Sequence, residues 1–167
     1  MGLCGLLGLS SYGQIQKHFT VENDSSFDRV DLTLSGGTGT CYIRPTPNEN
    51  PVNIYGRSES DAPSPLCESV LEQRTQKVNV NFIDGKVNES SISKMPFKVF
   101  ASNGEEPNQW HIYLSKKKPV NLHLNYGMGD AFVDLSGLSV EKLNINTGSA
   151  NVNVGYMSGQ YNQMEMD

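Results

Sequence analysis

Two glycines one residue apart, Gly127 and Gly129, form the strongest chemical motif in the sequence. A glycine-rich turn can cradle a phosphate group, because its backbone amides can approach an anion closely. A dinucleotide site also needs a third glycine, a following helix and a distant acid, and a P-loop needs Gly-Lys-Ser/Thr. None of these follows Gly129. The motif therefore predicts a chain reversal between strands and no cofactor site.

Calcium binding is the second chemistry that this turn suggests. Parallel β-rolls hold calcium with Gly-Gly-x-Gly-x-Asp repeats, and "SGGTGTCY" and "YGMGDAFVD" have a similar glycine spacing. The aspartate position is Cys41 in the first stretch and Ala131 in the second, so the repeated oxygen ligands of a hard cation are missing. We expect no metal site. Asp130 and Asp134 are the carboxylates that a metal would use; otherwise one faces solvent and the other caps a corner.

Acidic and aromatic residues suggest catalysis or sugar binding. Glu105, Glu106 and Asp84 could supply the paired carboxylates of a glycosidase, but they lie in predicted turns, where acids are usually only solvated. We therefore predict no catalytic residues.

A sugar-stacking platform would need aromatic residues, and four form a candidate interaction surface: Trp110, Tyr113, Tyr126 and Tyr156. In strands, such residues also serve as core residues or cross-strand pairs.

Composition narrows the class of protein. A chain of 167 residues suits one domain with one core. Charged residues make up 19%, the net charge is -5, and the longest basic run is Lys116–Lys118, so nucleic-acid binding is not expected. The three histidines are scattered and no Cys-x-x-Cys motif occurs, which argues against zinc. His111 and His123 alternate with apolar neighbours, and we expect both at the surface.

The first thirteen residues differ from the rest of the chain. Their apolar run, Leu3–Leu9, followed by small residues predicts the remnant of a secretory signal cleaved before Gln14, although no basic residue precedes it. The alternative is a short buried strand. Seven apolar residues are too few to span a bilayer, which takes about 20. The predicted organisation is a signal remnant at 1–13, a lead-in at 14–26 and one domain at 27–167 of an exported protein, which is periplasmic, cell-surface or extracellular.

Cys41 and Cys67 remain after removal of such a signal. In an exported protein they could form a disulfide that closes a loop of about 26 residues. Cys41 also lies in a strand pattern that points its side chain inward, and buried free cysteines are common. The sequence leaves both alternatives open.

Apolar residues alternate with polar ones from Phe27 onward, which predicts short strands. Leu66–Gln76 is the only stretch with helical spacing, and it predicts at most one or two helical turns. Asp84-Gly85 predicts a tight hairpin turn. The predicted strands lie within Val30–Ile43, Pro51–Gly56, Lys77–Val87 and Phe97–Leu114.

The last third of the chain repeats. "LHLNYGMGDAFV", which begins at Leu122, aligns with "LNINTGSANVNV", which begins at Leu143, at an offset of 21 residues, and Gly148 then corresponds to Gly127. Leu32, Leu34, Gly37, Gly39, Cys41 and Ile43 match the same template at an offset of 90. Such a unit buries its apolar face only when it is stacked on neighbours. We therefore predict an all-β, single-domain solenoid or sandwich of short stacked strands, with turns at these glycines.

Asparagines occupy the positions between the predicted inward residues. We expect them to line the outer face or to form ladders: Asn121, Asn125, Asn144, Asn146, Asn151 and Asn153.

The stretch Gln109–Val154 resembles the toast-rack and adhesin-like domains of bacterial envelope proteins, which share a β-solenoid with the C-terminal domain of cell-wall-active-antibiotic response proteins. The resemblance rests on a Trp-containing strand, a Pro before a Leu-x-Leu strand, a Gly-x-Gly turn, an Asp-Leu corner and a second Leu-x-Ile strand. The matching positions are Trp110, Pro119, Leu122, Leu124, Gly127, Gly129, Asp134, Leu135, Leu138, Leu143, Ile145 and Gly148. The second turn departs from the pattern, with Ala150 in place of its last glycine.

The resemblance implies a non-enzymatic envelope scaffold or adhesin-like interaction module, with no catalytic residues and no cofactor. Its expected partner is an envelope protein or a glycan. The alternatives are a carbohydrate-binding module, which would need a cluster of exposed aromatic residues, and a β-helix polysaccharide-active enzyme, which would need clustered acids and bases.

Overall fold

The computed structural model describes residues 15–36, 39–58, 65–82, 98–101, 109–156 and 163–166, and within them the chain forms eleven strands and no helix. In chain order the strands are β1 (Ile15–Val21), β2 (Arg29–Ser35), β3 (Thr40–Thr46), β4 (Val52–Ser58), β5 (Leu66–Glu72), β6 (Thr75–Asn81), β7 (Lys98–Ala101), β8 (Gln109–Ser115), β9 (Val120–Asp134), β10 (Val140–Gly155) and β11 (Gln163–Met166). The all-β prediction is confirmed. In the described part of the chain, no helix could cross a membrane.

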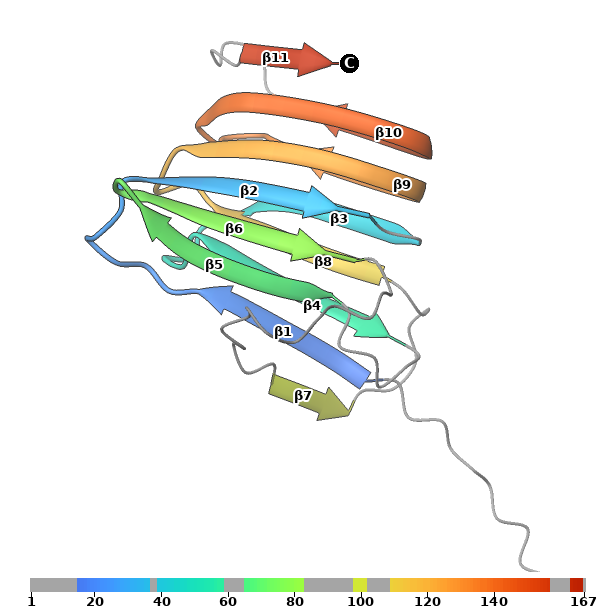
Figure 1. Ribbon diagram of the computed structural model, residues 1–167, viewed down its shortest axis with the longest axis horizontal. Helices are drawn as coiled ribbons and strands as arrows, with labels where there is room; N and C mark the ends of the chain where they lie inside the picture. Colours follow the sequence, from blue (N-terminus) through green and yellow to red (C-terminus); the bar gives the residue numbers. More distant parts are fainter. Residues whose placement is uncertain are drawn as a thin grey trace, which may run out of the picture.

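The strands form two layers that the long strands β9 and β10 join (Figure 1). The first layer contains β5, β6 and β2, then the first halves of β9 and β10, and then β11. The second layer contains β7, β1, β4, β8 and β3, then the second halves of β9 and β10. Residues Val120–Asn125 of β9 pair with β2, and Asp130–Val133 pair with β3. Each long strand therefore crosses from one layer to the other at its glycine turn.

The direction of pairing divides the molecule into two regions. The pairs β6–β2, β2–β9, β9–β3, β3–β8, β9–β10 and β10–β11 are parallel. The pairs at the other end, β5–β6, β8–β4, β4–β1 and β1–β7, are antiparallel. The parallel region is thus built of stacked coils, and antiparallel strands follow it at one end. Strand β1 belongs to this antiparallel end, although its sequence lies in the predicted lead-in.

The pairing register confirms the repeat. Leu122 lies beside Leu143, and Val133 lies beside Val154, which is the offset of 21 residues. Leu32 lies beside Leu122, and the matching positions of β3 and β9 are also partners, which is the offset of 90. Strand β11 continues the period, because Gln163 pairs with Lys142. Residues that are equivalent in the repeat therefore form columns across neighbouring strands.

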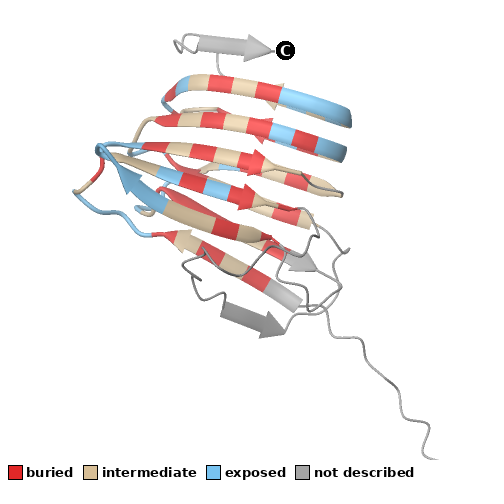
Figure 2. Ribbon diagram, viewed as in Figure 1, coloured by how far each residue is buried: buried red, intermediate tan, exposed pale blue. Residues whose placement is uncertain are grey.

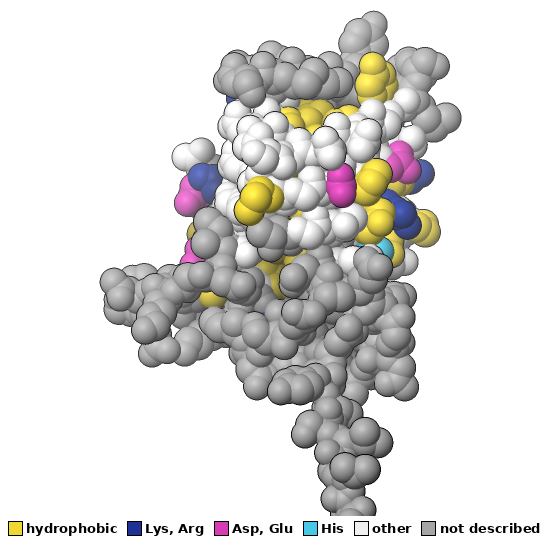
Figure 3. Space-filling view, turned by 90° about the vertical axis from the view of Figure 1, so that its right-hand side faces the viewer, with side chains coloured by type: hydrophobic (Ala, Val, Ile, Leu, Met, Phe, Trp, Pro, Cys, Tyr) yellow, Lys and Arg dark blue, Asp and Glu magenta, His cyan; other side chains and the backbone are white. Residues whose placement is uncertain are grey.

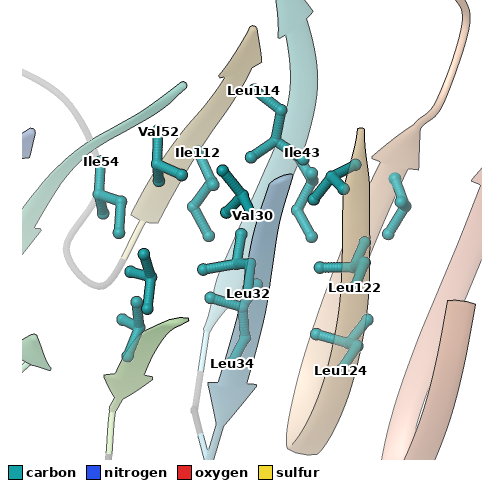
Figure 4. Packing of buried hydrophobic residues seen from close by; sticks show 14 of the residues in the cluster. Val30, Leu32, Leu34, Ile43, Val52, Ile54, Ile112, Leu114, Leu122 and Leu124 are labelled. Carbon is teal, nitrogen blue, oxygen red and sulfur yellow. The ribbon is translucent and has the colours of Figure 1, made fainter. Parts of the chain in front are cut away.

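The core lies between the two layers, where alternate side chains of the strands meet (Figure 4). The first layer contributes leucines such as Leu32 and Leu122, and the second contributes Ile43 and Ile112, all with 0% exposure. Burying such a side chain contributes about 1.5–3 kcal/mol. The alternation of buried and less buried residues along each strand is visible in Figure 2. Stacking in columns therefore explains why equivalent positions of the repeat carry large aliphatic side chains.

Leu66–Gln76 forms a hairpin, so the prediction of helical turns was wrong. Strands β5 and β6 are joined at Gln73 and Arg74, whose φ angles are 46° and 62°. Two consecutive positive φ angles match the right-handed twist of a tight hairpin but are unfavourable for residues with side chains. Arg74 is held there from outside the hairpin. Its guanidinium donates two hydrogen bonds to the Asp28 carboxylate, at 2.6 and 2.7 Å, and its carbonyl accepts one from the Asp28 amide, at 2.8 Å.

Candidate functional site

An aromatic row crosses the outer face of the second layer. We use this name for Phe132, Tyr42, His111, Tyr55 and His18, which lie on β9, β3, β8, β4 and β1. Each alternates with inward core residues, so the strand periodicity turns it outward. Pairing register then places the five residues side by side, each next to its neighbour in the row. In Figure 3, hydrophobic side chains gather with basic, acidic and histidine side chains at the right-hand edge of the view.

Rings stack on one another in two parts of the aromatic row. The ring centroids of Tyr42 lie 5.3 Å from Phe132 and 5.0 Å from His111, with interplanar angles of 13° and 11°. His18 stacks on Tyr55 at 4.2 Å and 10°. The Arg44 guanidinium lies 5.0 Å from the Tyr42 ring centroid. Stacked aromatic pairs are worth about 0.5–1.5 kcal/mol each beyond the area they bury.

This stacking limits what the row can bind. A sugar-stacking platform needs an open ring face, but here the near-parallel rings cover one another's faces across the strands. One imidazole nitrogen of the row is also used within the fold, since the His18 Nε2 atom lies 2.7 Å from the Thr20 hydroxyl oxygen. Phe132, at one end of the row, is 40% exposed. The arrangement suits cross-strand stabilisation better than sugar stacking.

The four predicted surface aromatics do not come together. Trp110 and Tyr126 are core residues, with 6% and 2% exposure, so their prediction as surface residues was wrong. Trp110 packs against Phe82 and lies directly over Gly56, where a Cβ atom would be 1.9 Å from the indole ring. The Tyr126 hydroxyl donates a hydrogen bond to the Gly39 carbonyl at 3.0 Å, and burial raises its pKa.

The other two aromatics are accessible but separate. Tyr113 lies beside the aromatic row, 6.4 Å from the His111 ring and 5.9 Å from the Tyr55 ring. Tyr156, which is 57% exposed, follows the end of β10. Sequence reasoning missed Tyr42, Tyr55 and Phe132. Their alternation with buried residues could have placed them outward, but only the pairing of distant strands makes them one row.

The glycine turns are corners of the fold and not a ligand loop. Gly39 and Gly129 have φ angles of 103° and 108°, and a Cβ at Gly129 would lie 2.1 Å from the Gly39 carbonyl oxygen. A Cβ at Gly148 would lie 2.9 Å from the Gly127 carbonyl oxygen. Gly127 and Gly148 have no positive φ, and Gly37 lies outside the described residues. Glycine is therefore needed for close stacking at Gly148 and for backbone conformation as well at Gly129.

Backbone groups at these corners already bond to other backbone groups. The Asp130 amide donates to the Gly39 carbonyl at 3.0 Å, and the Gly36 amide donates to the Asn125 carbonyl at 2.9 Å. An anion cradle needs several amides that point at a ligand. These two amides point instead at neighbouring coils, which supports the turn interpretation of Gly127 and Gly129.

The two carboxylates considered for a metal are used in separate contacts. Asp130 accepts a hydrogen bond from the Asn151 side chain at 3.1 Å. Asp134 accepts one from the Ser136 amide at 2.9 Å, and hydrogen bonds from Ser136 hold the pKa of Asp134 below its usual value. Asp134 thus caps a corner. Across the described ranges no group of three or more His, Cys, Asp or Glu side chains could hold a metal ion.

The outer face of the first layer is polar. The Asn146 side chain donates to that of Asn125 at 3.0 Å, which is the predicted asparagine ladder. His123 lies 3.2 Å from the Asp31 carboxylate and is turned outward, as predicted. His111 is also on an outer face, in the aromatic row.

Cys41 and Cys67 are free thiols in the core, so they form no disulfide with each other. Burial raises the pKa of each to about 12, which makes them poor nucleophiles. The candidate acids Asp84, Glu105 and Glu106 lie outside the described residues.

The same architecture occurs in a known protein structure. A solved "putative cell adhesion protein" from Clostridium sporogenes is 20% identical, with a TM-score of 0.69 over 92% of this chain and 68% of that one. A solved "putative adhesin" from Bacteroides fragilis is 17% identical, with a TM-score of 0.32 over 83% of this chain and 61% of that one. The first likeness shows a shared fold, and the second carries no argument. No curated protein matches the chain.

The family model of the N-terminal domain of toast_rack (DUF2154) matches residues 10–167. The match covers both layers, the glycine corners and the repeated coils described above. The chain therefore belongs to the toast-rack family, as the motifs in Gln109–Val154 predicted.

Proposed function

We propose that this chain is an exported, non-enzymatic β-solenoid domain that serves as a cell-envelope scaffold or an adhesin-like interaction module. The observation that carries the proposal is the fold shared with the "putative cell adhesion protein" of Clostridium sporogenes over 92% of the chain. Fold alone does not determine function, so the proposal also rests on how the polar groups are used.

The contacts of the polar side chains favour a structural and binding role over catalysis. Asp134 caps a corner, Asp130 bonds to Asn151, and Asp28 binds Arg74. A catalytic acid or base needs access to a substrate and a pKa suited to proton transfer. The pKa values of Asp28 and Asp134 are instead lowered by hydrogen bonds within the fold. These carboxylates therefore hold a hairpin turn, a corner and a neighbouring strand in place.

Export can be tested through the first thirteen residues. We expect a bacterial cell that expresses the chain to release or surface-display a protein that begins at Gln14, which N-terminal sequencing would identify. Replacing Leu6 and Leu7 with arginine should abolish export, because a signal needs an uninterrupted apolar run. Replacement of Ser10 and Ser11 with alanine keeps that run and is the matched control. A protein retained in the cytoplasm with an intact Met1 would contradict export.

Adhesion can be tested with immobilised envelope fractions, one of protein and one of polysaccharide. We expect the folded chain to bind the protein fraction saturably, and a lack of binding to both fractions would contradict an interaction role. Carbohydrate binding is the second candidate, because Phe132 presents 40% of its surface at one end of the aromatic row. Selective binding to glycans that is lost in Phe132→Ala would establish this candidate instead. Intrinsic tryptophan fluorescence is a poor probe, since Trp110 is buried.

A further inference from the structure

The basic run Lys116–Lys118 is divided by the fold. Lys116 and Lys117 are exposed, and the Lys117 ammonium lies 3.3 Å from the Glu49 carboxylate. Lys118 is half-buried, and its side chain contacts the connection between β1 and β2. We call this connection, residues 22–28, the strap, because it joins the second layer to the first at the end opposite the glycine corners (Figure 1). One lysine of the run is therefore bound within the fold.

The Lys118 ammonium group is surrounded by acceptors of the strap. Its Nζ atom donates hydrogen bonds to the Asp24 carbonyl at 2.5 Å and to the Phe27 carbonyl at 2.7 Å. The same atom lies 3.6 Å from the centroid of the Phe27 ring, whose face attracts cations. A lysine ammonium has three N–H donors, so two carbonyl oxygens and one ring face match them in number. Burial lowers the pKa of the Lys118 amine, because water is partly excluded from its charge.

The strap itself shapes the site around this ammonium group. The Ser26 amide donates a hydrogen bond to the Asp24 carboxylate at 2.8 Å, which closes a tight turn. The Phe27 side chain is only 3% exposed, so burial fixes the position of its ring. Between these two constraints, the carbonyl groups of Asp24 and Phe27 converge on one nitrogen atom. The site is therefore preformed, and an ammonium group that binds there has little order to create.

Two cations fasten the strap from different elements. Arg74, in the β5–β6 hairpin, donates to the Ser25 carbonyl at 3.3 Å and to the Asp28 carboxylate. Lys118 follows β8, in the turn that leads to β9, and donates to other acceptors of the strap. Arg74 therefore cannot replace the ammonium group of Lys118. Loss of that group would leave the strap attached to the hairpin but not to the β8–β9 turn.

We propose that residues 24–27 of the strap form a binding site for a primary ammonium group, which the chain fills with its own Lys118 and which keeps the strap closed with Phe27 buried. A primary ammonium fits because it is compact and donates in three directions. A guanidinium is planar and wider, and a quaternary ammonium has no N–H to donate. With the site empty, the strap opens and Phe27 becomes accessible. This site is separate from the proposed envelope function, which does not depend on it.

The unaltered 167-residue chain provides the first test. With its lysine side chains labelled with nitrogen-15, we expect one ammonium resonance whose hydrogens exchange slowly with water, because carbonyl groups hold them. The ring of Phe27 should also shift this resonance away from those of the other lysines. The resonance should be absent from Lys118→Met and present in Lys117→Met, which is the matched control.

Chemical rescue provides the second test. Lys118→Ala empties the site, and two rates report on the strap: hydrogen exchange of the Asp28 amide, which donates to the Arg74 carbonyl at 2.8 Å, and chymotrypsin cleavage after Phe27. Both rates should rise about tenfold, because hydrogen bonds to a charged group are lost. Propylammonium, which supplies the missing carbon atoms and ammonium group, should restore them, whereas tetramethylammonium at the same concentration should not. Lys117→Ala is the matched control and should leave both rates unchanged.

The proposal is overturned if no lysine ammonium of the unaltered chain exchanges slowly, or if the strap of Lys118→Ala stays as closed as before. Equal rescue by propylammonium and tetramethylammonium would also overturn it, because ionic strength and not a site would then be responsible. Thermal unfolding shows whether Lys118→Ala folds. If it does not, the same rates are measured in Lys118→Met, which keeps the apolar stem: an open strap supports the ammonium site, and a closed strap contradicts it.

Discussion

Gly129 is the residue of β9 where a side chain would cost most. Its φ is 108°, and a Cβ added at this position would lie 2.1 Å from the Gly39 carbonyl oxygen, so backbone strain and a clash combine. We expect Gly129→Ala to lower the free energy of unfolding by about 2–4 kcal/mol. Chemical denaturation monitored by circular dichroism measures this. Gly127→Ala is the matched control and should cost much less, since Gly127 is exposed and lacks a positive φ.

The comparison of the two glycines also revises an expectation from the motif. The motif alone predicts that a side chain would be equally unfavourable at Gly127 and Gly129. If Gly127→Ala proved as destabilising as Gly129→Ala, the corner would depend on both positions and the structural distinction between them would be wrong.

Asp134 should make stability depend on pH. Hydrogen bonds from Ser136 lower its pKa in the folded chain below the ordinary value of 3.8. The carboxylate therefore stabilises the fold above that ordinary value, and the contribution is lost as the pH falls through the lowered pKa. Asp134→Asn keeps an acceptor oxygen but removes the charge. We expect the variant to be less stable at neutral pH, and we expect the difference to disappear once the pH lies below the lowered pKa.

Urea denaturation of the unaltered chain and of Asp134→Asn, from neutral pH to below the lowered pKa of Asp134, measures the effect. A control is Asp130→Asn, whose partner is the Asn151 side chain. A constant difference between the chain and Asp134→Asn at all pH values would show that shape and not charge matters at this corner.

The aromatic row places side chains of five strands next to one another, in addition to the backbone hydrogen bonds between those strands. We expect Tyr42→Ala and Phe132→Ala to be non-additive, with a coupling energy of about 0.5–1.5 kcal/mol, because their rings stack at 5.3 Å. A double-mutant cycle of unfolding free energies measures it. Tyr42→Ala combined with Val70→Ala is the control, since Val70 lies on β5 in the other layer. Additive effects of Tyr42 and Phe132 would mean that the stack contributes nothing to stability.

The strands and their repeat could be predicted from the sequence because the signal is local. Inward residues of equivalent positions must stack in columns, so Leu32, Leu122 and Leu143 retain both type and spacing. The β5–β6 hairpin could not be predicted. Its turn, Gln73-Arg74, contains no usual turn former, and the contact that holds it comes from Asp28, far away in the sequence.

The candidate surfaces were less predictable than the strands. Period-two alternation indicates that Tyr42 and Phe132 each point away from the buried residues of their own strands. It does not show that the two residues share one outer face, or which strands are neighbours. Trp110 and Tyr126 show the opposite error. Both were grouped with surface aromatics by residue type, whereas their strand phase places them inward beside Ile112 and Leu124.

At the scale of the whole molecule, the predicted domain start can be tested by truncation. Removal of residues 1–13 should leave the unfolding transition nearly unchanged, since β1 begins at Ile15. Removal of residues 1–26 deletes β1, uncovers β4 and takes Phe19 and Val21 out of the core. Loss of a buried phenylalanine alone costs about 3–5 kcal/mol, so we expect this shorter chain to lose cooperative unfolding.

Thermal denaturation of the two truncated chains measures the difference. A chain that begins at Phe27 and still unfolds cooperatively at the original temperature would show that the lead-in is dispensable. Destabilisation by the shorter deletion would instead favour the alternative that the first residues form a buried strand.

The division into a parallel region and an antiparallel end has a consequence for how this architecture can change in evolution. Because β10 pairs with β9 at an offset of 21 residues from Lys142 onward, one whole coil can be removed or duplicated while the inward columns find equivalent partners. The antiparallel strands β4, β1 and β7 offer no such equivalence. We therefore expect related proteins to differ in length by whole coils in the parallel region. We expect the number of strands at the antiparallel end to be the same in all of them.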